Sequence, residues 1–281
     1  MPEDYVKINI GCGNCFVGSD DWVNLDLNAI NDSIQKKTFN SYVKNLSAES
    51  VNCIYMSHLI EHLDGDAVID FFDKAYRVLK PGGGIRIVTP DFDSIVHEYI
   101  RATEKGSTEI ASFEKLMLLE QCTRTEPSGT YRSEIRRLID KSDENDIVDH
   151  VYKRTGEHPL ENSNTKNLKR SKSRNLRAVC SRFFRRLSKR MLRCHLAMVR
   201  WLLPQCLRSN LSLTDAGERH LWIYSAYEVE QLARAKGFTA IFNMAHDQSK
   251  FLCVDELAIL DIADNGSARK GTHSMFLEVV K

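Results

Sequence analysis

The residues from Lys7 to Leu27, KINIGCGNCFVGSDDWVNLDL, constrain the fold more than any other stretch of the chain. They predict a short buried strand around Ile8, a turn that carries Gly11 and Gly13, and a second short strand that ends on Asp26. Glycines directly after a strand let the backbone approach a ligand closely, because no Cβ blocks it. A carboxylate at the end of the next strand can accept hydrogen bonds from a ribose diol. This stretch therefore predicts the nucleoside-binding edge of a parallel α/β sheet.

The composition is that of an ordinary globular protein. The chain has 281 residues, of which 42% are hydrophobic and 27% charged, enough for one large domain or one domain with an insertion. We expect a cytoplasmic protein, because the sequence shows neither a signal pattern nor a long apolar run. Eight scattered cysteines agree with a reducing compartment. Cys12 and Cys15 form a CxxC pair, but no second pair completes a zinc site, and we predict no metal.

The near-neutral net charge of +1 hides a strong asymmetry. Between Asn162 and Thr214 there are fourteen Lys or Arg residues and no Asp or Glu, so the rest of the chain carries a net charge of −13. An acidic body with a basic insertion indicates a partner of opposite charge for the insertion.

A parallel crossover is predicted between residues 51 and 90. Val51–Ser57 is an apolar, β-branched strand, and Asp66–Leu79 has apolar residues at helical spacing. Pro81 and three glycines end that helix before a strand at 85–90. A weaker strand is expected near Thr38–Val43.

The remaining chain divides into three parts. Asp91 to about Glu120 is predicted helical, and Cys122–Thr165 irregular. Apolar residues then advance by threes and fours from Arg174 until Pro204, with arginines and lysines on the other side, which predicts a basic amphipathic helix. The last part contains a helix with a capping box formed by Ser225 and Glu228 and a stop at Gly237, followed by predicted strands at 239–245, 257–263 and 274–280.

Four stretches together resemble class I S-adenosylmethionine-dependent methyltransferases, and more narrowly those of bacterial surface-polysaccharide biosynthesis. They are INIGCGN with VNLDL, IYMSHLIEHL, YRVLKPGGGIRIVTPDF, and RHLWIYSAYEVEQLARAKGF with the terminal SMFLEVVK. The resemblance covers about 60% of the chain. It implies an α/β fold with a Rossmann-like, seven-stranded methyltransferase sheet whose last strand is antiparallel, interrupted here by the helical basic insertion.

The resemblance also implies site residues for S-adenosyl-L-methionine. Gly11, Cys12 and Gly13 would wrap the methionine part of the cofactor, and Asp26 would hold its ribose. A sulfonium cofactor without phosphates needs close backbone contact and a carboxylate, and no GK[ST] sequence follows Gly13. Ser57 and His58, where the predicted strand at 51–57 ends, complete the cofactor side.

Two positions depart from the family pattern. Asn9 stands where many relatives carry an acid. The usual acidic contact to adenine falls around Asn40 or Ser41, and the amide oxygen of Asn40 can still accept a hydrogen bond from the adenine amino group.

The HLIEH sequence at His58, Glu61 and His62 also matches a zinc pattern of one metalloprotease class. We reject zinc proteolysis because the motif follows a buried strand and is interrupted by Asp64-Gly65. Three roles remain open for Glu61 and His62: contact with the acceptor, binding of a divalent ion, or capping and solvating the helix.

Methyl transfer to a hydroxyl needs alignment and a group that takes the proton. The candidates are His58, Asp91 and His220. For Asp91 the structural alternative is a helix N-cap, and for His220 it is a surface residue before a capped helix. An enzyme without a dedicated base is the third alternative.

Three interpretations of the basic insertion compete. Residues 174–203 suit the surface of an anionic membrane, which would place the enzyme at the inner face of the plasma membrane beside a lipid-linked glycan. The same charges could bind nucleic acid, which is less favoured because no nucleic-acid motif is present. The apolar face could also pack on the sheet or on a second subunit.

We therefore predict a methyltransferase core at 1–120 and 214–281, divided by an insertion at 121–213. The main hypothesis is methyl transfer to a hydroxyl of a saccharide or lipid-linked saccharide of the cell envelope. The alternatives are a nucleic-acid-binding protein on a degenerate methyltransferase fold, and a methyltransferase that acts on a small molecule or on nucleic acid.

Overall fold

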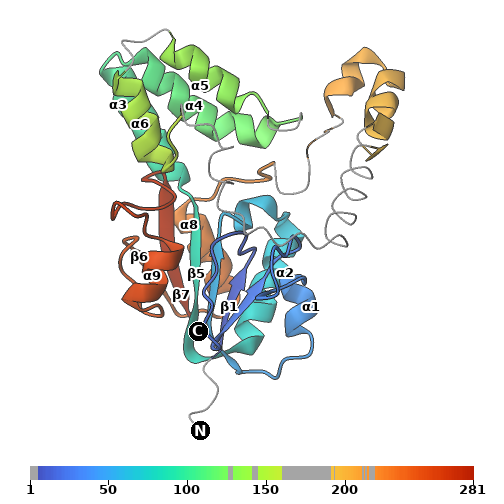
Figure 1. The fold of residues 1–281 in the computed structure, drawn as a ribbon, viewed down its shortest axis with the longest axis vertical. Helices are drawn as coiled ribbons and strands as arrows, with labels where there is room; N and C mark the ends of the chain where they lie inside the picture. The colour runs from blue at the N-terminus through green and yellow to red at the C-terminus, as the bar shows by residue number, and fades with distance from the viewer. Residues whose placement is uncertain are drawn as a thin grey trace.

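A seven-stranded sheet organises the molecule (Figure 1). The computed structural model describes residues 6–125, 129–140, 145–159, 191–192, 194–210, 212, 214 and 219–281. The sheet order is β3-β2-β1-β4-β5-β7-β6. Its strands are β1 (Lys7–Ile10), β2 (Trp22–Leu25), β3 (Ile34–Gln35), β4 (Val51–Ser57), β5 (Leu79–Pro90), β6 (Ala240–Met244) and β7 (Ser274–Val280). The first five strands pair in parallel, and β7 runs antiparallel to both β5 and β6. This is the methyltransferase-like arrangement that the resemblance implied.

Helices cover both faces of the sheet. Successive residues of a strand point to opposite faces, so Ile54 and Met56 of β4 join one core and Cys53 and Tyr55 join the other. The first core contains the buried faces of α1 (Phe39–Val43), α2 (Gly65–Val78) and α8 (Ala226–Ala235). The second contains α9 (Val254–Leu260). The buried strands read as apolar runs because both faces are covered.

Four further helices form a layer beyond the ends of β4 and β5 (Figure 1). They are α3 (Phe92–Glu104), α4 (Thr108–Thr123), α5 (Tyr131–Ile139) and α6 (Asn145–Thr155). Ile95, Phe113 and Val151 belong to the apolar core of this layer. Buried Glu114 of α4 accepts hydrogen bonds from Arg154 of α6 at 2.8 and 3.1 Å. Arg154 also donates to the backbone oxygen of Thr272 at 3.1 Å, which ties the layer to the segment before β7.

Most of the predicted core is confirmed. The strand at 51–57, the following helix and the parallel strand after it occur as β4, α2 and β5. The structure extends β5 back through Pro81 and the glycines, with a register shift opposite Val51 and Cys53. The capping box of Ser225 and Glu228 opens α8 as predicted, and Gly237 follows its end with a φ of 96°.

Two predicted strands are wrong. Thr38–Val43 is not a strand, because the Thr38 side chain accepts a hydrogen bond from the Ser41 N–H and α1 begins at Phe39. The sheet's third strand is instead β3, two residues long. Residues 257–263 are not a strand either, because Glu256 closes a capping box with Cys253 and α9 runs to Leu260.

The prediction of irregular structure over Cys122–Thr165 is also wrong where the chain is described. Ile135, Leu138 and Ile139 of α5 and Ile147 and Val151 of α6 recur at helical spacing and are buried. Their apolar faces are narrow and the helices are short, so the many polar residues around them dominate the sequence pattern. The linker at 162–174 and the first part of the predicted basic helix lie outside the described residues.

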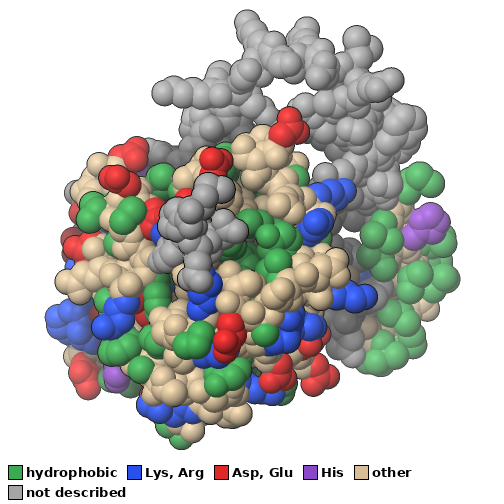
Figure 2. Space-filling view, turned by 90° about the horizontal axis from the view of Figure 1, so that it is seen from below, with side chains coloured by type: hydrophobic (Ala, Val, Ile, Leu, Met, Phe, Trp, Pro, Cys, Tyr) green, Lys and Arg blue, Asp and Glu red, His purple; other side chains and the backbone are tan. Residues whose placement is uncertain are grey.

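The end of the predicted basic helix is helical at 191–192 and 194–202, and η3 (Gln205–Asn210) follows Pro204. This outlying segment, residues 191–210, lies to one side of the sheet in Figure 1, and Figure 2 shows hydrophobic side chains gathered on it at the right. Trp201 is 71% exposed and Leu202 67%. Among the described residues, no helix combines the length and the apolar character that crossing a bilayer requires.

Candidate active site

The glycine turn after β1 is joined to the end of β2 by backbone hydrogen bonds. The N–H groups of Gly11 and Cys12 donate to the Leu25 oxygen at 2.8 and 3.2 Å. The N–H of Gly13 donates to Oδ2 of Asp26 at 2.9 Å. Gly11 and Gly13 have backbone φ values of 63° and 52°, which residues with a Cβ atom rarely adopt. The predicted turn and the predicted carboxylate therefore lie side by side.

Two buried asparagines hold the rest of this loop. The Asn9 amide donates to the Cys15 oxygen at 2.9 Å and to Oδ1 of Asn24 at 3.2 Å. The Asn24 amide donates to the Val17 oxygen at 2.8 Å. Asn9, which replaces the acidic residue of the family pattern, thus holds the loop after β1 in place through its side-chain amide. Asn24 also holds this loop, through its hydrogen bond to Val17, and no sequence pattern indicated that role.

Cys12 is buried in the turn. Burial raises the pKa of its thiol to about 12, so the side chain stays protonated and uncharged at neutral pH. A protonated thiol is a poor metal ligand and a poor nucleophile. The structure therefore supports a packing role for Cys12 in place of CxxC chemistry.

A buried carboxylate lies where β4 ends. Glu61, in the short η1 helix (Ile60–His62), is fully buried, and its Oε2 accepts a hydrogen bond from Thr89 of β5 at 3.1 Å. Its Oε1 is 3.2 Å from Nδ1 of His58, but the angle between them does not make a hydrogen bond. Burial would raise the pKa of Glu61, yet His58 and His220 outweigh burial and lower it to about 2. The carboxylate is therefore ionised.

His58 occupies a strained position between β4 and η1. Its φ of 49° is left-handed, and its Nε2 is 3.1 Å from Oγ of Ser274, the first residue of β7. The ring also meets His273 edge-on, with 5.9 Å between centroids. His58 thus lies at the carboxyl edge of β4, as predicted, between Glu61 and the start of β7.

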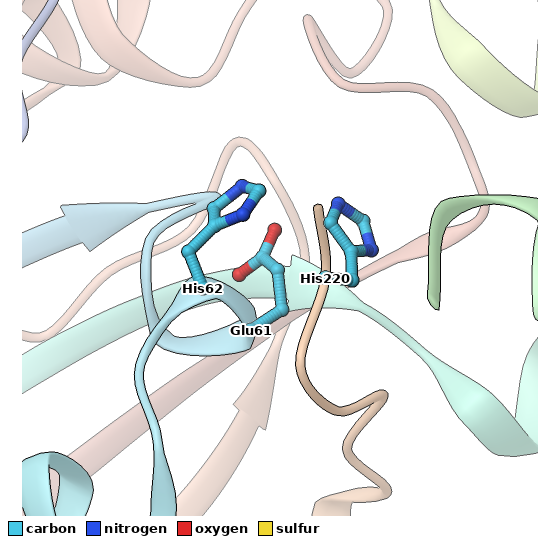
Figure 3. Close-up of side chains that lie close together, drawn as sticks. All are labelled: Glu61, His62 and His220. Carbon is cyan, nitrogen blue, oxygen red and sulfur yellow. The ribbon is translucent and has the colours of Figure 1, made fainter. Parts of the chain in front are cut away.

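His62 and His220 flank the same carboxylate (Figure 3). Their rings meet edge to face with 4.7 Å between centroids. His220 is 5% exposed, so its interpretation as a surface residue is wrong. Burial lowers the pKa of His220 to about 4, which keeps the ring neutral. The backbone oxygen of Glu61 accepts from the Leu221 N–H at 2.7 Å, and this contact brings the distant segment to η1.

A groove of about 660 Å³ opens beside these histidines, between the N-terminal half of α2 and one side of α8 along its whole length. Its floor is apolar, and Trp222, Tyr224 and Tyr227 line it. Trp222 is 55% exposed, and its indole N–H donates to Glu228 at 3.0 Å, which fixes the ring. The groove therefore offers aromatic faces with a carboxylate at its rim.

The other predicted site residues are more dispersed. Asp91 is the N-cap of α3, where Oδ1 accepts from the Asp93 N–H at 3.1 Å, and burial raises its pKa. Ser57 ends β4, half-buried beside His58. Asn40 lies on α1, five positions beyond the end of β3, and its amide donates to Asp70 of α2 at 2.6 Å. Its role at the adenine stays a prediction.

The comparisons with known proteins agree with this geometry. Residues 23–87 match the model of a methyltransferase domain family. Together with the strand order, this match supports an S-adenosylmethionine-dependent methyltransferase domain. No curated protein matches the chain.

Solved structures resemble this methyltransferase only distantly. A S-adenosylmethionine-dependent methyltransferase from Archaeoglobus fulgidus is 12% identical, with a TM-score of 0.39, over 99% of this chain and 87% of that one. A protein from Bordetella parapertussis described as a possible exported protein is 9% identical, with a TM-score of 0.40, over 99% of this chain and 62% of that one. Such low scores add nothing to the strand order and the domain match.

The residues present fit S-adenosylmethionine as the cofactor of this methyltransferase. A Cβ on Gly13 would meet nothing within 4 Å, so the loop leaves open space above it. The Asp26 carboxylate is held by the N–H groups of Gly13 and Asn28 and is half-exposed at the strand end. Gly11, Cys12 and Gly13 would hold the methionine part through the backbone, and Asp26 would hold the ribose.

Several residues that are distant in sequence contact His58 and Glu61 at the carboxyl end of β4, and sequence reasoning did not identify them. Ser274 and His273 reach His58 from the segment before β7, and Thr89 reaches Glu61 from β5. Thr89 and Ser274 lie in stretches that carry the family resemblance, but the sequence assigns neither of them, nor His273, a role at the site. Only the order of the strands, with β7 beside β5, could have indicated that Ser274 lies near the end of β4.

Proposed function

We propose that this methyltransferase transfers a methyl group to a hydroxyl of a saccharide or lipid-linked saccharide used in cell-envelope polysaccharide biosynthesis. One observation carries the proposal: an aromatic-lined groove opens beside a cluster of three histidines around one buried carboxylate. A pyranose presents a flat apolar face of C–H groups that stacks on indole and phenol rings, and its hydroxyls bind polar groups at the rim.

The groove suits such an acceptor in its polar groups as well as in its rings. Glu228, held by the Trp222 indole, and Gln231 lie on the α8 side, and Asp64 lies on the α2 side. A sugar seated on Trp222 and Tyr227 would place hydroxyls toward these groups.

The histidine cluster supplies a group for the proton that a hydroxyl must lose. S-adenosylmethionine supplies an electrophilic methyl group when it is bound. Nδ1 of His58 faces the ionised Glu61, so Nε2 is the atom that would accept the proton, and Glu61 stabilises the resulting imidazolium. Asp91, whose carboxylate caps α3, is the weaker candidate.

We also propose that the basic insertion brings the enzyme to an anionic membrane surface, at the inner face of the plasma membrane. The described end of that insertion carries exposed apolar side chains, among them Met198, Trp201 and Leu202. Fourteen basic residues between Asn162 and Thr214 provide the attraction to anionic headgroups. A lipid-linked acceptor would then lie close to the groove.

The decisive experiment has a cofactor step and an acceptor step. Calorimetry should show S-adenosylmethionine binding to the intact chain, weakened at least tenfold by Asp26→Ala. Asp20→Ala is the matched control, because Asp20 is exposed just before the other end of β2. Mass spectrometry of a cell-envelope extract incubated with enzyme and isotopically labelled methyl donor should then find the label on a saccharide.

A labelled product other than a saccharide would indicate a different acceptor. Label on RNA or DNA, with binding that weakens steeply with salt, would reject the saccharide in favour of a nucleic-acid acceptor. Label on a free small molecule would retain the enzyme and reject the envelope role.

A further inference from the structure

Glu61, His62 and His220 place three metal-binding side chains together, and their chain neighbours Leu63 and Leu221 line the groove. One donor atom from each lies within 4.8 Å of the other two. Figure 3 shows the carboxylate of Glu61 between the two imidazole rings. The residues come from η1 and from a segment almost 160 positions later, so their meeting is a property of the fold.

Two buried atoms of the cluster have no hydrogen-bond partner in the part of the chain that the structure describes. They are Oε1 of Glu61, in a side chain with no exposed area, and Nδ1 of His220, in a residue that is 5% exposed. Leaving a buried polar atom unpaired costs about 1–3 kcal/mol, and more for a charged group. Such atoms commonly mark the position of a ligand or ion.

The tautomer of His62 suits metal binding. Its Nδ1 lies 2.9 Å from the backbone oxygen of Arg219, which can only accept a hydrogen bond. Nδ1 therefore carries the proton, and the lone pair is on Nε2. A histidine that donates one N–H to a backbone carbonyl and offers the other nitrogen is the usual arrangement of a metal ligand.

The cluster is also held in place from several sides. Thr89 donates to Oε2 of Glu61, and the Leu221 N–H donates to the Glu61 backbone oxygen. The His220 N–H donates to the Gln121 oxygen at the end of α4 at 3.1 Å, and Nε of Arg219 donates to the Cys122 oxygen at 2.8 Å. Little rearrangement separates these side chains from a binding geometry.

We propose that Glu61, His62 and His220 bind one divalent transition-metal ion. Two imidazoles and one carboxylate favour ions such as Zn²⁺, Mn²⁺, Fe²⁺ or Co²⁺ over Mg²⁺ and Ca²⁺, which prefer oxygen ligands. Three protein ligands leave coordination positions open, as in catalytic metal sites. The neighbouring groove gives an acceptor access to those positions.

The role of the ion rests on the proposed function. A hydroxyl of the acceptor bound to the metal would lose its proton more easily, because the cation stabilises the alkoxide. The proton would pass to His58, and the alkoxide oxygen would attack the methyl group as the C–S bond breaks. The metal thereby explains how a neutral sugar hydroxyl becomes a nucleophile at this edge.

Metal binding is measured without cofactor or acceptor, so its outcome is independent of the proposed function. Untagged protein is stripped with a chelator, dialysed against Zn²⁺ or Co²⁺, and analysed for bound metal and for the visible absorption of Co²⁺. We expect about one equivalent per chain. Mg²⁺ in the same range should neither bind tightly nor displace Co²⁺.

Variants assign the ligands. His62→Ala, at a half-buried residue that tolerates change, should weaken binding at least tenfold and alter the Co²⁺ spectrum, and Glu61→Gln should do the same. His97→Ala, at an exposed histidine of α3, should leave both unchanged. Circular dichroism confirms that each variant is folded.

Two results would overturn the inference: less than a tenth of an equivalent bound, or binding that His62→Ala leaves intact. Methyl transfer to a saccharide that a chelator does not slow would reject the catalytic role of the ion alone. Metal binding without any saccharide methylation would reject the proposed acceptor and retain the site.

Discussion

At the scale of single residues, the cofactor loop depends on backbone conformations that few side chains tolerate. Gly11 has a φ of 63°, and an added Cβ would lie 3.3 Å from Cδ1 of Leu59, which follows His58. The loop that is predicted to hold the cofactor thus lies against Leu59, which follows His58 in the chain. A change at Gly11 is expected to disturb both.

Gly11→Ala should lower the free energy of unfolding by about 1–2 kcal/mol, since a left-handed alanine costs that much, and should weaken S-adenosylmethionine binding about tenfold. Denaturant unfolding and calorimetry measure the two effects. Gly18→Ala is the matched control, because Gly18 has no positive φ and its Cβ would meet nothing within 4 Å. Equal effects of the two substitutions would contradict the prediction.

At the scale of elements, α9 is fixed to the sheet by one carboxylate. Oε1 of Glu256 accepts from the Trp22 indole at 2.7 Å and from the buried Lys7 ammonium, and Oε2 accepts from the Cys253 N–H at 2.8 Å. Burial would raise the pKa of Glu256, but Lys7 and Trp22 outweigh burial, so the pKa is lowered from its ordinary value of 4.5. The ionised form is therefore the one that stabilises the fold.

The contribution of Glu256 to the stability of the fold depends on pH. Because the folded-state pKa lies below 4.5, the stabilisation is complete above that pH and is lost as the pH falls through the lower folded value. Glu256→Gln should cost about 1–3 kcal/mol at pH 7, because buried Lys7 loses its close carboxylate partner while Asp21 lies 3.8 Å away. Its melting temperature, followed by calorimetry, should then fall less steeply than that of the wild type below pH 4.5. Parallel curves for the two proteins would refute this assignment.

The elements also show which parts of the fold are predictable from sequence. Strands β1, β4 and β7 and helices α2 and α8 carry clear apolar periodicity or caps, and the predictions for them are confirmed. Residues 257–263 read as a strand because their apolar run is short, and only the cap at Cys253 distinguishes the helix. Among site residues, Gly11, Gly13 and Asp26 follow from local sequence. The meeting of Glu61 with His220 depends on contacts between distant segments, which no local pattern encodes.

At the scale of the whole molecule, the helical layer is held to the sheet through buried charges. Arg154 pairs with Glu114 inside the layer and reaches Ser94 and the Thr272 backbone, and Nδ1 of His273 contacts the Arg154 oxygen. His273 in turn touches His58. His273 therefore connects the layer to the candidate active site, in addition to the contacts of His220 and Arg219 with the end of α4.

Arg154→Met should cost about 1–3 kcal/mol, since the buried Glu114 carboxylate loses Arg154 and keeps His150, 2.8 Å away. Hydrogen exchange should accelerate in α4 and α6 and stay unchanged in α2. Arg137→Met removes an exposed pair with Glu134 and should change the unfolding free energy by no more than about 0.5 kcal/mol. Uniform acceleration over all helices would show that the layer is not a separate unit.

Membrane attachment is testable through the tryptophans. In a Trp222→Phe background, anionic vesicles should shift the emission of exposed Trp201 to shorter wavelength, whereas zwitterionic vesicles should not, and Trp22 is buried. Deletion of residues 166–203 should abolish sedimentation with anionic vesicles. A shift that persists in the additional Trp201→Phe variant, or sedimentation that survives the deletion, would reject the membrane partner.

The strand order has a consequence for synthesis on the ribosome. β7 is made after β6 but lies between β5 and β6, so β6 has no strand to pair with until β7 emerges. Until then β5, central in the finished sheet, remains an open edge that can pair with other chains. The nascent chain can thus complete the Gly11–Asp26 side long before His58 meets Ser274. Slow translation after β5 should therefore expose the growing protein to aggregation at that edge.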